Sequence, residues 1–201
     1  IEHSPYADKY KVGESVNDLY LFHYTGVNPL TGQYTFEDYN LNGRLDDRII
    51  SAPGTGLDDR YVRLNLTPRF NGGIGTDFSY NNLSISCFFD FRNQMGMKPG
   101  LSPGTGIGGM LNLPNDVIGN YWKQPGDLAK YPKPTTLQDI NFANYTNSDA
   151  TYENCSYIRL SNVAVSYAFD QKFVKKLGAE SLSLRMNAQN IFLISSSKGM
   201  D

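Results

Sequence analysis

Paired segments of alternating apolar and polar residues constrain the fold of this chain more than any other feature. In residues 83–92, apolar side chains alternate with serine, aspartate and arginine. Residues 69–80 alternate in the same way, and the dipeptide Asn81-Asn82 joins the two segments. A period of two places successive side chains on opposite faces of a β-strand. The pattern therefore predicts a β-hairpin.

A second pair of alternating segments, residues 157–169 and 181–194, predicts another two strands. The connector between them carries Lys172, Lys175 and Lys176. Each predicted strand is about ten residues or longer, which is long for a globular protein but suits a tilted strand that crosses a bilayer.

Composition leaves two all-β classes open. Aromatic residues make up 13% of the chain, and the mean hydropathy is −0.42. A soluble β-sandwich fits these values, and so does a transmembrane β-barrel, whose strands alternate between lipid and lumen. The polar strand faces would be solvated in the sandwich and would line the lumen in the barrel; they carry Asp77, Asp90, Arg92, Arg185, Asn187 and Gln189. The aromatic residues of the other faces would form a core or interfacial girdles; they are Phe78, Tyr80, Phe89, Phe91, Tyr167 and Phe169.

Charge and cysteine content exclude several functions. A formal net charge of −2 gives no overall electrostatic basis for binding nucleic acid or an anionic membrane surface. Cys87 and Cys155 are too few and too far apart for a disulfide framework, so both are expected to be unpaired. The sequence contains no recognisable catalytic set, and we expect neither an enzyme nor a required cofactor.

Loop lengths predict an orientation for the barrel alternative. Outer-membrane barrels have short periplasmic turns and long extracellular loops. Residues 25–68 and 93–155 are then extracellular, and the second of these stretches, rich in Gly, Pro and Asn, is expected to be irregular. The Asn81-Asn82 turn and the lysine-bearing connector are periplasmic.

The stretch "DYNLNGRLDD" (38–47) matches the first two-thirds of an EF-hand calcium loop. Gly43 permits the sharp turn, but Ile49 stands where a bidentate Glu is needed. The candidate calcium ligands are Asp38, Asn40, Asn42, Asp46 and the carbonyl of Arg44. The alternative is a turn in which Asp and Asn side chains accept hydrogen bonds from backbone N–H groups.

An aromatic loop is the candidate contact for substrate or a partner protein. It holds Tyr121, Trp122 and Tyr131, whose rings could stack on sugars or anchor an interface. The alternative is that Trp122 packs the loop onto its own barrel rim.

Five stretches carry motifs in a fixed order: an Asp-rich glycine turn, P-x-F-x-G-G, W-x-x-P-G-D, S-Y-[IL]-R-L-x-N-[VA], and x-x-Q-N-[IL]-F followed by G-x-D. They lie within residues 31–47, 67–96, 121–134, 152–178 and 182–201. Together they resemble the C-terminal part of SusC/RagA-type TonB-dependent outer-membrane transporters of Bacteroidetes.

This resemblance implies that residues 1–201 are one segment of a large antiparallel transmembrane β-barrel in the cell outer membrane. The plug domain and final strand of the family are not among these residues, which cannot close a barrel alone. The implied function is oligosaccharide or peptide import. The implied partners are a SusD-type lipoprotein, the remaining barrel and plug, outer-membrane lipid, and TonB acting through an N-terminal region. The competing class is a soluble extracellular β-sandwich that binds a glycan or a protein.

Overall fold

The chain divides into two compact units. The computed structural model describes residues 6, 10–45, 58–98, 115–136 and 140–197. We call residues 68–94 and 155–201 the sheet unit, and residues 1–67 and 95–154 the loop unit. Each unit is described by itself.

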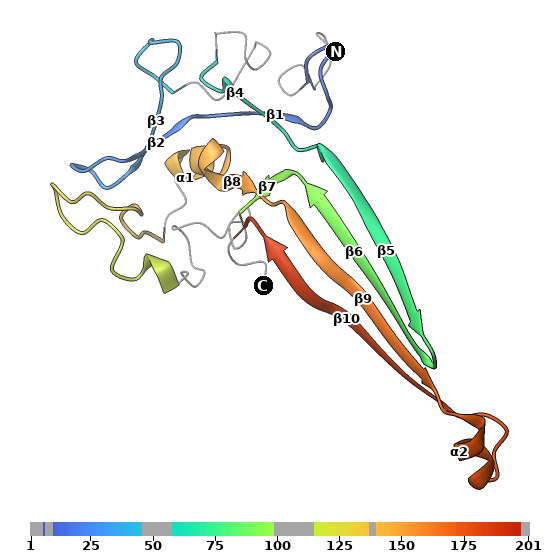
Figure 1. The fold of residues 1–201 in the computed structure, drawn as a ribbon. Coiled ribbons are helices and arrows are strands. Elements are labelled where there is room, and N and C mark those ends of the chain that lie inside the picture. The colour runs from blue at the N-terminus through green and yellow to red at the C-terminus, as the bar shows by residue number, and fades with distance from the viewer. Residues whose placement is uncertain (1–5, 7–9, 46–57, 99–114, 137–139, 198–201) are drawn as a thin grey trace. The chain divides into compact units, whose positions relative to one another are not determined.

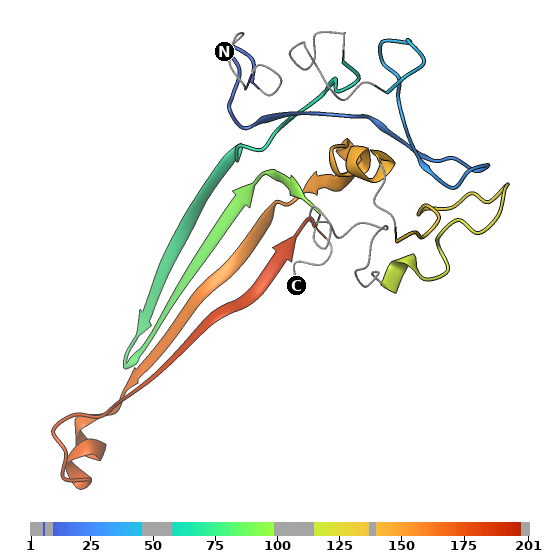
Figure 2. The same ribbon diagram turned by 180° about the vertical axis from the view of Figure 1, so that it is seen from behind.

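The sheet unit is a four-stranded antiparallel sheet in the order β10-β9-β6-β5 (Figures 1 and 2). Its strands lie within or close to the four alternating segments and are 11 to 13 residues long. The strands are β5 (Phe70–Tyr80), β6 (Leu83–Asn93), β9 (Tyr157–Ala168) and β10 (Ser183–Ser195). The predicted antiparallel all-β fold is confirmed.

The register gives the sheet two different faces. Residues directly opposite each other in an antiparallel pair share a face. One row across the sheet consists of Tyr80, Leu83, Tyr167 and Leu184. The adjacent row, on the other face, consists of Ser79, Ser84, Ser166 and Arg185. Apolar and polar rows therefore alternate, as the sequence pattern requires.

Bulges interrupt this alternation in β9 and β10. The register with β6 skips Ser161, and the register between β9 and β10 shifts between Gln189 and Phe192. Asn190 there has a positive φ of 51°, a conformation that Asn tolerates better than most residues. Beyond the bulge, Leu160 and Ile158 continue the apolar face although their numbers change parity.

The two strand-to-strand connections lie together at one end of the sheet. Asn81, with φ of 49°, turns β5 into β6, and the six-residue helix α2 (Gln171–Lys176) connects β9 to β10. At the opposite end β5 begins, β6 ends and β9 begins, and the chain passes there into the loop unit.

The loop unit contains three two-stranded pairs. They are β1 (Asp18–Leu21) with β4 (Val62–Asn65), β2 (Tyr24–Val27) with β3 (Tyr34–Phe36), and β7 (Met95–Met97) with β8 (Tyr152–Asn154). Its helices are α1 (Ile140–Thr146), η1 (Asn115–Val117) and η2 (Asp149–Thr151). Within the described residues, no helix is long and apolar enough to cross a membrane.

Residues 93–155, expected to be an irregular stretch, contain several short elements. This stretch contributes β7, β8 and all three helices of the loop unit. The pairing of β7 with β8 joins residues more than fifty positions apart, for example Met95 with Asn154. A pairing at this distance leaves no local pattern in the sequence, because each strand has only three residues.

Candidate functional site

The apolar face of the sheet is open to its surroundings in the sheet unit. Met186 is 66% exposed and Phe78 is 59% exposed, although both are large and apolar. Further exposed members of this face are Phe70, Ile74, Tyr80, Ile158, Leu184, Phe192 and Ile194. An apolar face of this extent needs to be covered by lipid or by another protein surface.

The polar face carries a charged network across β6 and β9. Asp90 lies directly opposite Arg159, and the guanidinium donates to both carboxylate oxygens, at 3.0 Å from Nε and 3.1 Å from Nη2. Ser161, at the β9 bulge, donates to the same carboxylate. The Arg159 guanidinium also lies 5.4 Å from the ring centre of Tyr157. A bidentate pair of this kind fixes geometry as well as charge.

Sequence reasoning placed Asp90 on the polar face but missed its partners. Arg159 and Ser161 are 69 and 71 positions away along the chain. The pairing depends on the register of β6 against β9, which the bulge at Ser161 shifts. The available signal was the charge of Arg159, which strict alternation from Val163 would have placed on the apolar face.

Two glycines of β5 lie under aromatic rings of β6. A methyl group at Gly73 would lie 2.5 Å from Cζ of Phe88, on the polar face. A methyl group at Gly72 would lie 2.8 Å from Cζ of Phe91, on the apolar face. The rings therefore occupy the space that side chains would need at these two positions.

Stacked tyrosines form the core of the loop unit. Tyr34 and Tyr145 stack with ring centres 4.1 Å apart, and Tyr24 meets both rings edge-on. Burial, with Tyr145 nearby, raises the pKa of Tyr24 to about 12, and burial also raises the pKa values of Tyr34 and Tyr145. The cluster joins β2 and β3 to α1.

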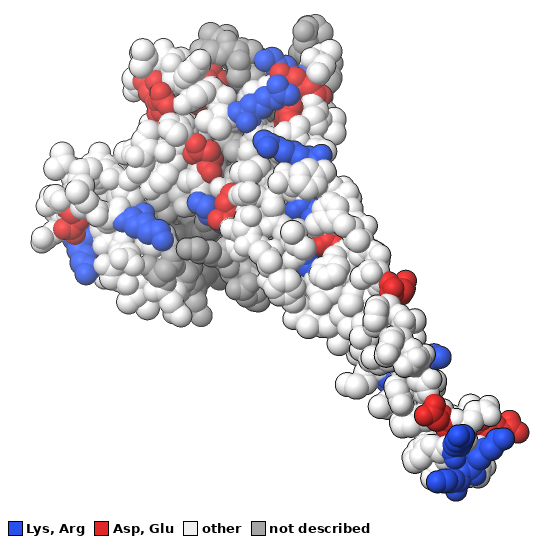
Figure 3. Space-filling view, viewed as in Figure 1, with Lys and Arg blue, Asp and Glu red and all other residues white. Residues whose placement is uncertain are grey.

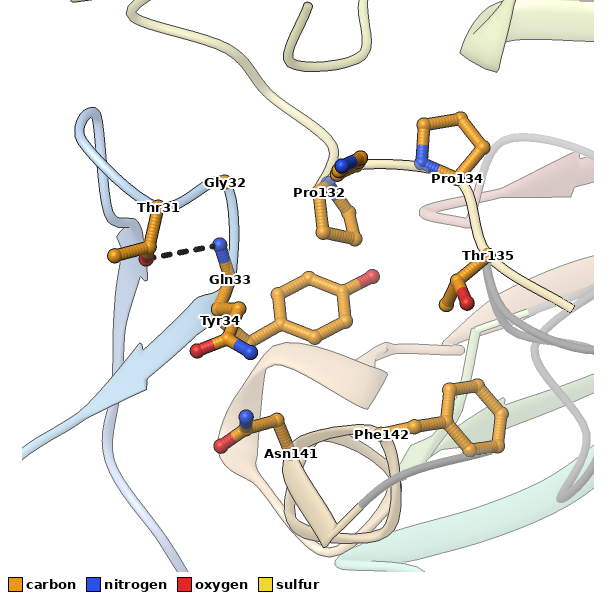
Figure 4. Close-up of a pocket in the computed structure, with 10 residues that line it drawn as sticks. Thr31, Gly32, Gln33, Tyr34, Pro132, Pro134, Thr135, Asn141 and Phe142 are labelled. Carbon is orange, nitrogen blue, oxygen red and sulfur yellow. Dashed lines mark hydrogen bonds between the residues drawn. The ribbon is translucent and has the colours of Figure 1, made fainter. Parts of the chain in front are cut away.

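A hollow of about 300 Å³ opens beside this cluster (Figure 4). Tyr34 lies between the two walls of the hollow, facing the segment that carries Pro132 and Pro134. The other lining residues are Thr31, Gly32, Gln33, Lys133, Thr135, Asn141 and Phe142. The hollow thus combines ring surfaces with amide and hydroxyl groups, a mixture that suits a polar organic ligand.

Two buried carboxylates form ion pairs within the loop unit. Asp18 is 3% exposed, accepts a hydrogen bond from Arg63 Nε at 3.0 Å and another from Asn65. The Arg63 guanidinium holds the pKa of Asp18 below its ordinary value. Asp58 is fully buried and pairs with Arg60 at 2.8 Å. Each of these carboxylates is thus paired with an arginine.

The predicted calcium loop forms a turn held by side-chain oxygens. The Asp38 carboxylate accepts hydrogen bonds from the N–H groups of Asn42, at 3.2 Å, and Gly43, at 2.7 Å. Asn40 Oδ1 accepts from Asn42 N–H, and Asn42 Oδ1 accepts from Arg44 N–H. Gly43 has φ of 80°. Asp46 lies outside the described residues.

These bonds use only part of the acceptor capacity of the oxygens. An ionised carboxylate offers about four lone-pair sites, and the described bonds to Asp38 occupy two of them. The hydrogen-bonded turn that was the alternative interpretation is present. Calcium binding at the same oxygens stays a prediction. Among the described residues, no group of three or more His, Cys, Asp or Glu side chains could hold a metal ion.

Of the aromatic contact residues, Trp122 is buried against its own chain. It is 7% exposed, and its indole Nε1–H donates to the carbonyl of Pro29 at 2.8 Å. Tyr121 and Tyr131 are half-buried and belong to a backbone bridge. For Trp122 the geometry favours the packing interpretation over contact with a ligand. Neither Cys87 nor Cys155 is part of a disulfide in the structure.

Comparisons with known proteins point to one kind of membrane protein. No family model matches the chain. TonB-dependent receptor P39 of Formosa agariphila is 27% identical over 165 residues, covering 81% of this chain and 14% of the receptor. TonB-dependent receptor P3 of the same organism is 24% identical over 201 residues, covering 94% of this chain and 19% of the receptor.

Two solved structures share the fold. The structure of the RagAB peptide transporter matches with a TM-score of 0.63 at 18% identity. The RagAB peptide importer in its closed-closed state matches with a TM-score of 0.61 at 19% identity. Each match covers 90% of this chain and 20% of the solved chain. The chain therefore spans a fifth or less of the length of all four proteins.

Long antiparallel strands with one apolar and one polar face, shared with these structures, define a wall segment of an outer-membrane β-barrel. The two TonB-dependent receptors of Formosa agariphila narrow this class of membrane protein. The chain resembles a segment of a SusC/RagA-type TonB-dependent receptor, as the sequence motifs predict, and the predicted outer-membrane location is confirmed.

Proposed function

We propose that this chain forms part of the wall and loops of a TonB-dependent importer that carries a bulky nutrient, an oligosaccharide or a peptide, across the outer membrane. The observation that carries the proposal is the two-faced sheet, whose apolar rows and polar rows lie on opposite sides across all four strands. In a bilayer the apolar face meets lipid and the polar face meets the water-filled interior.

The polar face suits a path for hydrophilic solutes. The Arg159 guanidinium and the Ser161 hydroxyl both donate to the Asp90 carboxylate, so this network keeps a fixed shape when wetted. The same face carries Asp77, Arg185 and Asn187, which line a shallow hollow of about 300 Å³ on the sheet. Polar groups of both charges favour a neutral or zwitterionic solute over one of strong net charge.

The loop unit supplies the proposed contacts for substrate. The hollow beside Tyr34 offers ring surfaces for a sugar or a proline-like side chain, and Gln33 and Asn141 offer donors and acceptors. The RagAB structures are described as a peptide transporter and a peptide importer, which supports peptides as one substrate class. By family resemblance, a SusD-type lipoprotein captures the nutrient and TonB supplies energy.

Calcium in the Asp38 loop would stiffen this part of the loop unit. Purified full-length receptor is expected to retain about one Ca²⁺ per chain at this loop, and Asp38→Ala is expected to lose it, because the carboxylate is the only charged ligand among the described ones. Metal analysis of both proteins measures the difference. Equal calcium content would leave the hydrogen-bonded turn as the complete explanation.

Transport itself is tested in cells. A strain lacking the full-length receptor should fail to take up one oligosaccharide or peptide class that the wild type imports, and uptake should stop when the proton-motive force is collapsed. Complementation with a Gly32→Ala receptor should restore membrane insertion but not full uptake, because a methyl group at Gly32 displaces the Trp122 indole and disturbs the wall of the hollow. Uptake that persists without the receptor or without energy would contradict the proposal.

A further inference from the structure

The turn end of the sheet carries a helix with two separate stripes. Phe173 and Leu177 are 49% and 60% exposed and, being four residues apart, lie on the same side of α2. Val174 is 1% exposed and fixes the helix to the rest of the turn. The second stripe consists of Lys172, Lys175 and Lys176, all exposed. Figure 3 shows these cations gathered at this end of the sheet unit.

The apolar stripe continues the lipid-facing side of the sheet. Tyr167 belongs to the apolar face, and its ring meets Phe169 edge-on with centres 5.0 Å apart. The Phe169 ring lies 5.7 Å from that of Phe173. An unbroken path of rings thus leads from the membrane-facing strands onto α2. The exposed apolar surface of the helix begins where that of β9 ends.

The lysines are available to an external anion. Within the described part of the chain, no ion pair joins Lys172, Lys175 or Lys176 to a carboxylate. The Asp170 carboxylate, which begins the helix, accepts a hydrogen bond from Asn82 Nδ2 at 2.9 Å and ties α2 to the β5–β6 turn. The cationic stripe therefore keeps its charge free beside the apolar one.

We propose that α2 is a membrane-surface anchor that binds anionic phospholipid headgroups of the leaflet at the turn end of the sheet. Phe173 and Leu177 insert at the boundary between headgroups and acyl chains, as amphipathic interfacial helices do. The lysine stems extend along that boundary and their ammonium groups donate to lipid phosphates. A soluble partner would have no reason to meet a surface continuous with the lipid-facing strands. The inference depends on the outer-membrane location and not on the nutrient.

Hydrogen exchange of the full-length receptor in lipid nanodiscs tests this anchor. The probes are nanodiscs of zwitterionic phosphatidylcholine alone and of phosphatidylcholine with phosphatidylglycerol. Amides of residues 171–177 should exchange about tenfold more slowly in the anionic nanodiscs, since three lysines each gain a favourable interaction with the surface. High salt should reduce the difference because it screens the lysine charges.

Matched variants test whether the lipid-dependent difference in exchange arises from the lysine charges or from a change in the folding of α2. Replacing Lys172, Lys175 and Lys176 by Gln should abolish the lipid-dependent difference. The same replacement at Lys123, Lys130 and Lys133 of the loop unit should leave it intact. Phe173→Ser with Leu177→Ser should speed exchange in both nanodiscs. Identical exchange of wild-type α2 in both nanodiscs, or slowing that appears only with an added soluble protein, would overturn the proposal. Uptake by the lysine variant is measured separately. A failure of the proposed transport function can therefore be distinguished from a failure of the proposed membrane anchor.

Discussion

Gly32 and Trp122 show how single contacts shape the loop unit. Gly32 has φ of 71°, and a methyl group there would lie 2.5 Å from two atoms of the buried indole. The Gly32 carbonyl also accepts a hydrogen bond from Lys133 N–H at 2.8 Å. The turn that contains Gly32 and the loop that contains Trp122 are therefore one packed structure.

Replacing Gly32 with Ala is expected to destabilise this structure in two ways. The left-handed backbone costs about 1–2 kcal/mol for a residue with a Cβ, and displacing the indole adds about 1–3 kcal/mol. The measurement is the free energy of local opening in residues 28–34 and 120–133, obtained by hydrogen exchange of the full-length receptor.

Gly119→Ala is the matched control for this prediction. Gly119 also has a positive φ, of 84°, but nothing lies within 4 Å of a methyl group placed there. It should therefore show only the backbone cost. Equal effects of the two substitutions would mean that Trp122 does not pack over Gly32.

Some of these residue-scale features of the loop unit could be predicted from the sequence. The spacing of Asp38, Asn40, Asn42 and Gly43 was enough to predict an oxygen-rich turn, since each hydrogen bond there joins residues at most five positions apart. The burial of Trp122 was left as one of two alternatives. Its partner, Pro29, is 93 positions away, so no local pattern could decide between them.

At the scale of elements, substitution by Arg is expected to have different effects on the two faces of β10. Ala188 lies in an apolar row opposite Val163, and Gln189 lies in the next, polar row opposite Asn162. Arg at position 188 would have to enter lipid near the middle of the strand, which costs about 2–4 kcal/mol. Arg at position 189 would reach water.

Ala188→Arg is therefore expected to reduce folding of the receptor far more than Gln189→Arg. The measurement is the fraction of full-length receptor that resists unfolding by detergent in electrophoresis without heating, after extraction from the outer membrane. Equal fractions for the two neighbouring variants would contradict the assignment of the faces.

A second element-scale prediction concerns the bond between β6 and β9. A double-mutant cycle of Asp90→Asn and Arg159→Gln should give a favourable coupling energy, because the guanidinium donates to both carboxylate oxygens. The cycle is read from the unfolding of the full-length receptor. Strictly additive effects would show that the two groups are solvated independently.

The stability of the β1–β4 pair is expected to depend on pH. Arg63 lowers the pKa of Asp18, so the folded carboxyl titrates below its unfolded value of about 3.9. Its stabilisation is complete above that value and is lost as the pH falls further through the folded pKa. Exchange of residues 18–21 and 62–65 should accelerate in that acidic window in the wild type and not in Asp18→Asn. Equal acceleration of exchange in Asp18→Asn would mean that a group other than Asp18 causes the pH dependence.

Alternation predicted the four long strands and their faces because the period is a property of each strand alone. It did not predict the shift at Ser161, where Val163 and Leu160 share a face although they are three positions apart. A bulge is defined by the register with neighbouring strands, which the pattern of one strand does not contain. The short strands of the loop unit were missed because three or four residues are too few to show a period.

At the scale of the whole molecule, the four-stranded sheet requires further strands along its two edges. β5 and β10 are the edges of the described four-stranded sheet. Unpaired backbone N–H and C=O groups are costly in lipid, so in a membrane both edges must pair with further strands. The matched receptors are at least five times longer than the part aligned with this chain, which is in keeping with that requirement.

Spin labels at successive positions of β10 test the central claim, that this sheet is a barrel wall between lipid and water. The full-length receptor is reconstituted in liposomes with one label at a time at positions 184 to 188. Collisions with oxygen, which concentrates in lipid, should be frequent at 184, 186 and 188. Collisions with a water-soluble nickel complex should be frequent at 185 and 187. Labels at 184, 186 and 188 shielded from both reagents would instead show the packed core of a soluble sandwich, and would contradict the account.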